Sequence, residues 1–156
     1  MDLNKILQIR QFSASNADFT LEGTVVIYGE LQETDKTCPK CGEKAHRPHQ
    51  YYEKRVRHLP ILGNPTYLVF QRKDFICDCG KVFLERLEFQ DLKRRCTKAY
   101  EEYIYRMARK QDFSSVAESE GVSWDLVEGI FLKGGHTKRV KTQRARRREL
   151  EAIACG

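Results

Sequence analysis

The chain has 156 residues, of which 40% are hydrophobic and 32% charged, and its formal net charge is +6. This composition is typical of a soluble globular chain with one domain or two small ones. No apolar run reaches the ~18 residues of a membrane span, and residues 1–15 lack the apolar region of a signal peptide. We therefore expect a cytoplasmic protein without a membrane partner, in a reducing compartment where clustered cysteines bind metal.

The excess positive charge lies at the C-terminus. Residues 133–156 contain eight lysines and arginines and two glutamates, which accounts for the whole net charge, whereas the remaining residues balance. A basic run of this kind attracts phosphate-bearing partners.

The first ninety residues are predicted to be rich in strands. Residues 18–31, 66–77 and 81–89 combine β-branched and aromatic side chains in the pattern of half-buried strands. Residues 35–57 instead contain few aliphatic side chains, so we expect a loop that cannot order itself without an added constraint.

Two cysteine pairs supply that constraint. Cys38 and Cys41 lie in the motif C-P-K-C-G, and Cys77 and Cys79 lie in C-D-C-G. Each pair is followed by a glycine, which tolerates the backbone angles of a tight turn around an ion. A tetrahedral set of four thiolates favours zinc. The spacing therefore predicts a zinc ribbon, with the strands on either side of the second pair forming a hairpin.

Two alternatives for this site remain open in the sequence. A C-x-x-C pair can be a redox centre, although Pro39 and Gly42 favour a turn over a helix start. The second pair is one residue tighter than a usual ribbon turn, so His46, His49 or His58 could replace one thiolate. Four protein ligands close the coordination sphere, which makes the predicted zinc structural and leaves no catalytic residue to assign.

The two remaining cysteines are left out of the metal site. Cys96 and Cys155 have no partner at ligand spacing. We expect Cys96 on one face of a helix over residues 93–110, where apolar residues recur at helical spacing without glycine or proline.

A helix-turn-helix is predicted after this first helix. Ser114 or Ser115 can cap a short helix, and Gly121 can end it in the left-handed conformation. Ser123 can then cap a further helix over residues 124–132. A short helix, a glycine turn and a second capped helix are the parts of this DNA-binding motif.

The second helix of such a motif enters the major groove with its first residues at the base edges. We therefore expect Ser123, Trp124 and Asp125 to contact bases. Because this helix carries no basic residue before its end, we expect phosphate contacts from the basic residues on either side of it, namely Lys93, Arg94, Arg95, Lys133, Lys138, Arg139, Arg144, Arg146, Arg147 and Arg148.

Taken in order, these motifs resemble the N-terminal region of bacterial insertion-sequence transposases of the ISL3 group. The resemblance covers roughly residues 1–132 and rests on C-P-x-C-G, on R-V-R-H-L-P at residues 55–60, and on the approach to and exit from the second cysteine pair. The approach contains Arg72 and Lys73, and the exit contains Phe83 and Glu85. A further motif, R-R-x-T, follows with Arg94, Arg95 and Thr97.

The resemblance implies a zinc finger and a helix-turn-helix that bind the terminal inverted repeats of the element. In the family a catalytic domain with an aspartate-aspartate-glutamate triad normally follows. Here no aspartate occurs after Asp125, and the last two dozen residues are too few for that domain. We therefore expect a non-enzymatic chain.

Together these observations predict an α+β fold, with a small zinc-ribbon-like β module followed by a helical helix-turn-helix domain. The expected boundaries are residues 1–90 for the zinc finger, 91–133 for the helix-turn-helix and 134–156 for a basic tail. The predicted function is sequence-specific binding of double-stranded DNA by a truncated, transposase-derived protein, at a transposon end or as a regulator at a promoter. The alternative is a zinc-ribbon adaptor between proteins. A homodimer or a protein partner is left open.

Overall fold

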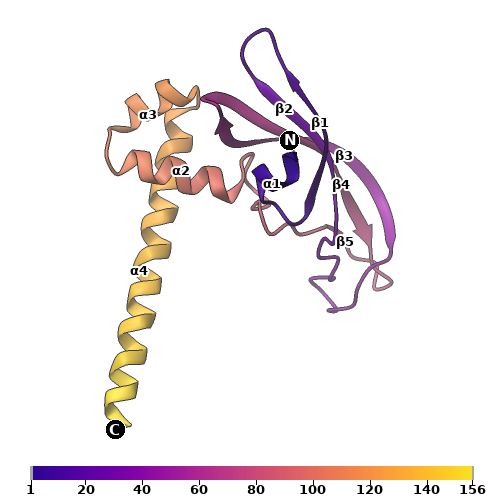
Figure 1. The fold of residues 1–156 in the computed structure, drawn as a ribbon. Helices are drawn as coiled ribbons and strands as arrows, with labels where there is room; N and C mark the ends of the chain where they lie inside the picture. The colour runs from indigo at the N-terminus through magenta and orange to yellow at the C-terminus, as the bar shows by residue number, and fades with distance from the viewer. Residues whose placement is uncertain (1, 156) are drawn as a thin grey trace. The chain divides into compact units, whose positions relative to one another are not determined.

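The computed structural model describes residues 2–155, and of residues 139 and 140 it describes only the backbone. The chain divides into two compact units, Met1–Tyr100 and Glu101–Gly156. The first unit is mainly β and the second is helical, which confirms the predicted α+β class (Figure 1). Among the described residues no helix is long and apolar enough to cross a membrane.

The first unit is built on one five-stranded sheet. Its strand order is β1-β2-β4-β3, and β5 pairs with the end of β4. Strands β2 and β4 run parallel, and the other neighbours are antiparallel. The elements of this unit are α1 (Leu3–Leu7), β1 (Phe12–Phe19), β2 (Val25–Leu31), β3 (Arg47–Ile61), β4 (Asn64–Ile76) and β5 (Val82–Leu84).

The core of this unit lies against one face of the sheet. Ile27 on β2, Val56 on β3 and Leu68 on β4 are almost fully buried. Phe70 packs edge-on against Phe12 and Phe89, with ring centroids 6.0 and 5.9 Å apart. The loop after β5 therefore closes the core although it forms no strand of its own.

Three strand predictions were wrong in detail. Residues 18–31 are two strands and not one, because Gly23 (φ 79°) turns the chain between β1 and β2. Of residues 81–89, only Val82–Leu84 are a strand. The predicted loop over residues 35–57 contains the first eleven residues of β3. The backbone of β3 is held by its ladder with β4, so this strand forms without a buried aliphatic pattern in its exposed first half.

The second unit contains three helices. Helix α2 (Lys98–Ala108) begins at the end of the first unit, and α3 (Phe113–Glu120) and α4 (Trp124–Ala154) follow. Asp112 caps α3 by accepting a hydrogen bond from the backbone N–H of Ser115, so the predicted serine cap is wrong. The predicted Ser123 cap of α4 is confirmed. Gly121 ends α3 in the left-handed conformation (φ 63°), also as predicted.

Buried apolar residues fix α3 against α4. Val116 and Val127 are fully buried, and the rings of Phe113 and Phe131 lie 5.1 Å apart. A further aromatic contact joins α2 to α4, where Tyr105 stacks on Phe131 at 5.6 Å. This arrangement is the helix-turn-helix predicted from the Gly121 turn and the Ser123 cap.

Helix α4 is much longer than the predicted segment 124–132. It continues to Ala154 and spans 31 residues, or ~46 Å at 1.5 Å per residue. Its C-terminal half extends past α2 and α3 as a single helix (Figure 1). No glycine in the left-handed conformation stops it, since Gly134 and Gly135 both lie within the helix.

Candidate metal centre and nucleic-acid interface

The structure brings the four predicted cysteines together. One ligand atom from each of Cys38, Cys41, Cys77 and Cys79 lies within 4.8 Å of all the others. The Sγ atoms of Cys41 and Cys77 are 3.4 Å apart, and those of Cys38 and Cys79 are 3.7 Å apart. A tetrahedral zinc with Zn–S bonds of ~2.3 Å requires sulfurs roughly 3.8 Å apart, so the geometry fits this ion.

Each cysteine pair lies in a tight backbone turn that is closed by the N–H of the following glycine. In the first turn the N–H of Gly42 donates to the carbonyl of Cys38 (3.0 Å), and in the second the N–H of Gly80 donates to the carbonyl of Cys77 (2.9 Å). Both glycines have positive φ values, 76° and 85°. A side chain at either position would be strained, which explains the glycine after each pair.

The electrostatics of the cluster also favour a cation. Burial opposes ionisation of Cys38, but hydrogen bonds from the backbone N–H groups of Cys41 and Lys40 outweigh it and lower its pKa to about 6. For Cys41, a backbone hydrogen bond at Glu43 acts to lower the pKa, but the neighbouring thiols, Cys77 first, raise it to about 12. One cysteine therefore ionises readily, and its negative charge opposes ionisation of the next cysteine. A divalent cation would neutralise this repulsion between thiolates.

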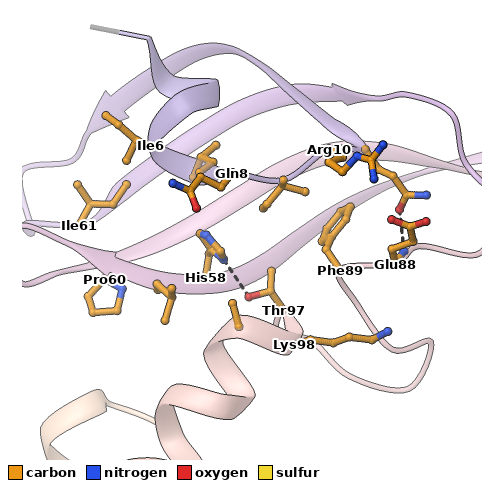
Figure 2. Close-up of a pocket in the computed structure, with 15 residues that line it drawn as sticks. Ile6, Gln8, Arg10, His58, Pro60, Ile61, Glu88, Phe89, Thr97 and Lys98 are labelled. Atoms are coloured by element: carbon orange, nitrogen blue, oxygen red, sulfur yellow. Dashed lines mark hydrogen bonds between the residues drawn. The ribbon is translucent and has the colours of Figure 1, made fainter.

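No histidine belongs to the described metal-binding group. His58 is only 5% exposed, and its Nδ1 lies 2.9 Å from Oγ1 of Thr97, as Figure 2 shows. Burial lowers the pKa of His58 to about 4. This histidine is therefore a neutral residue at the floor of a ~580 Å³ pocket beneath α1, away from the cysteines.

A buried polar network supports the second cysteine pair. Arg72 and Glu85 are 3% and 2% exposed, and an Nη2 proton of Arg72 donates to the backbone carbonyl of Glu85 at 2.7 Å. The Glu85 carboxylate accepts hydrogen bonds from the Thr34 hydroxyl and from the N–H of Lys73. Arg72, Lys73 and Glu85 belong to the motifs that carry the family resemblance, and their contacts show that they shape the scaffold around the hairpin that bears Cys77 and Cys79.

Cys96 is likewise part of the scaffold. It is buried and forms an isolated bridge with Arg57 of β3, before α2 begins, so its predicted place on a helix face is wrong. Thr97, next to it, accepts a hydrogen bond from the N–H of Tyr100 at the start of α2.

The residues expected to contact bases lie at the exposed start of α4. Ser123 and Asp125 are exposed, and Trp124 is 45% exposed with its ring 5.7 Å from Phe113. Val127 forms the buried side of this turn, and Trp124 lies at the edge of the contact with α3.

The expected phosphate-contacting residues fall into three groups. Lys133 pairs with Glu101 at 2.9 Å, and the ammonium of Lys138 lies 4.1 Å from the ring centroid of Tyr105, so both face α2. The side chain of Arg139 lies outside the described residues. Further along α4 are four exposed arginines, Arg144, Arg146, Arg147 and Arg148. In the first unit the residues before α2 are Lys93, Arg94 and Arg95, of which Arg94 is half-buried.

Two family models match the chain, one on each part of this arrangement. Residues 35–79 match the zinc-finger of transposase IS204/IS1001/IS1096/IS1165, and residues 85–134 match the helix-turn-helix domain of transposase family ISL3. Searches of curated proteins and of solved structures gave no match. The zinc-finger match and the four clustered cysteines identify zinc as the cofactor. This chain therefore carries the zinc-finger and helix-turn-helix regions of the ISL3 family of transposases.

Proposed function

We propose that this chain binds double-stranded DNA sequence-specifically, at a transposon end or a promoter, as a transposase-derived protein that acts by binding and not by strand transfer. The observation that carries the proposal is the start of α4. Ser123 caps a helix whose first turn presents Trp124 and Asp125 to solvent in a helix-turn-helix. This is the place from which such a motif reads base edges.

We propose a division of work between three parts of the chain. Residues 91–133 read the sequence with Ser123, Trp124 and Asp125. Residues 1–90 form the zinc finger, in which Cys38, Cys41, Cys77 and Cys79 hold a structural zinc. Phosphate contacts then come from basic residues that flank the reading helix, with residues 134–156 as the main source; the proposed set is Lys93, Arg94, Arg95, Lys133, Lys138, Arg139, Arg144, Arg146, Arg147 and Arg148.

Charge supports this division. Helix α4 has Asp125 and Glu128 but no basic residue before Lys133, and Lys133 already pairs with Glu101. The reading turn therefore gains little from phosphate attraction and depends on base contacts, each worth about 1–3 kcal/mol. The four exposed arginines beyond it supply attraction that is independent of sequence.

The test compares two variants on a matched and a scrambled duplex, the matched one selected from random DNA with the wild-type protein. Ser123→Ala with Asp125→Ala should reduce the preference for the matched duplex and leave affinity for the scrambled one nearly unchanged. Glutamine at Arg144, Arg146, Arg147 and Arg148 should weaken both, and flatten the salt dependence by up to ~0.9 in the log–log slope per lost phosphate contact.

If the arginine variant instead loses the preference for the matched duplex and the Ser123 and Asp125 variant loses only overall affinity, the roles are reversed and the tail reads the sequence. If neither variant changes binding, or selection yields no preferred duplex, DNA reading by α4 is wrong and the zinc-ribbon adaptor becomes the better account.

A further inference from the structure

The pocket beneath α1 lies wholly within the first unit and has the size of a small-molecule site. Its volume is about 580 Å³, and such sites usually measure roughly 300–1,000 Å³. Four segments that are far apart in sequence line it (Figure 2): residues 6–11 at the end of α1, residues 58–61 at the end of β3, residues 88–89 after β5, and residues 97–99 at the start of α2. None of these residues is assigned to DNA or to zinc by the proposed function.

Most of the wall of the pocket is apolar. Leu59 and Ile61 on β3 and Phe89 on the facing loop are half-buried, and Ile6 on α1 is 44% exposed at the edge. These side chains still contact water. A ligand with an apolar body would remove this surface from water, which favours its binding.

The floor of the pocket carries one hydrogen-bond donor. Oγ1 of Thr97 accepts the backbone N–H of Tyr100, and within the described residues the acceptor for its hydroxyl proton is Nδ1 of His58. Because the imidazole of His58 is neutral, its single ring proton is then on Nε2.

Nε2 of His58 is open to the pocket. It has no hydrogen-bond partner among the described residues, and it is not among the enclosed polar atoms that lack one. Figure 2 shows the ring with Thr97 on one side and Gln8, an exposed residue, on the other. The N–H of Nε2 is therefore available to an acceptor oxygen of a ligand, at the bottom of an otherwise apolar site.

The charges around the pocket balance. Arg10 and Glu88 are both exposed at its edge and have opposite signs, and Lys98 pairs with Asp91 at 3.8 Å. The floor adds no charge, because His58 is neutral. An ionised group would therefore lose its hydration in this pocket without gaining an opposite charge, which disfavours a carboxylate and favours an uncharged oxygen acceptor.

We propose that this pocket binds a small uncharged carbonyl compound, whose apolar body packs between α1 and the end of β3 and whose carbonyl oxygen accepts the Nε2 proton of His58. An amide, ester or ketone on an aromatic or branched aliphatic body has this chemistry. The site is independent of the DNA-reading turn, so it gives the chain a second binding activity.

The test titrates the full, zinc-loaded, ¹⁵N-labelled chain at pH 7.5 with 1-naphthylacetamide and, separately, with 1-naphthylacetate, which has the same ring and a charged head. The amide should shift backbone NMR signals of residues 6–11, 58–61 and 97–99 saturably. A Kd on the order of 1 mM is expected for a ligand of about fourteen non-hydrogen atoms. The acetate should bind several-fold more weakly. No saturable shift, shifts confined to other residues, or equal affinity for the two probes would overturn the proposal.

Two variants test the site itself. His58→Phe keeps a ring of similar shape but removes the donor, and should weaken amide binding about five- to tenfold. Ala99→Leu enlarges an exposed residue at the edge of the pocket and should also weaken binding, whereas Ala145→Leu, the same change on the exposed part of α4, should bind as wild type does. Wild-type affinity in a folded His58→Phe chain refutes the role of Nε2. If that variant does not fold, Ala99→Leu decides, and wild-type affinity in it refutes the site.

Discussion

The buried His58 should make the stability of the chain depend on pH in a way that one substitution removes. His58 is neutral in the folded chain because burial lowers its pKa from 6.5 to about 4. As the pH falls below 6.5, the unfolded chain takes up a proton at this residue and the folded chain does not until about pH 4. Stability is therefore full above pH 6.5 and is lost as the pH falls toward 4.

The magnitude follows from the two pKa values. At pH 5.5 about nine-tenths of the unfolded chains and only a few per cent of the folded chains would carry the proton. Between pH 7.5 and 5.5 this difference lowers the free energy of unfolding by about 1.3 kcal/mol. In the folded chain His58 keeps its contact with Thr97, the residue whose hydroxyl caps the start of α2, because the proton is taken up by the unfolded chain.

The assay is urea unfolding followed by circular dichroism at pH 7.5, 6.5 and 5.5, with zinc in excess. His58→Asn is the comparison, because its amide can approach Thr97 but does not titrate. Groups shared by both proteins, the cysteines included, cancel in the difference between the two pH profiles. The variant should lose about 1.3 kcal/mol less than wild type over this range. Parallel profiles for the two proteins would refute a buried neutral His58.

Two further predictions concern the metal site and the helix packing. Cys77→Ser should lower bound zinc well below one ion per chain and unfold the hairpin between β4 and β5. Cys155→Ser changes an exposed thiol outside the cluster and should keep the full zinc content. Equal zinc content in the two variants would exclude Cys77 as a ligand. Gly134→Ala should lower the melting temperature, because the new methyl clashes with the ring of Tyr105. Gly135→Ala, where no atom beyond the adjoining residues of the helix lies within 4 Å of the new methyl, should raise the free energy of unfolding by up to ~1 kcal/mol. A change of stability in the same direction for both variants would argue against packing of Tyr105 on α4.

The sequence alone determined the features that depend on local backbone chemistry. Glycines after Cys41 and Cys79 permit turns with positive φ, and Gly121 and Ser123 mark the end of one helix and the start of the next. Such signals act over two or three residues, so they can be recognised without knowing what surrounds them. The cysteine cluster follows from them, because four thiolates in such turns need a common ion.

Only the tertiary structure decided the features that depend on distant partners. The first half of β3 is a strand because β4 lies beside it, although its own residues are exposed and lack an apolar pattern. The charge of Lys133 is matched by Glu101, thirty-two residues earlier, which no spacing rule along α4 would reveal. His58 is neutral because of what surrounds it. Burial and pairing between residues far apart in sequence are set by packing.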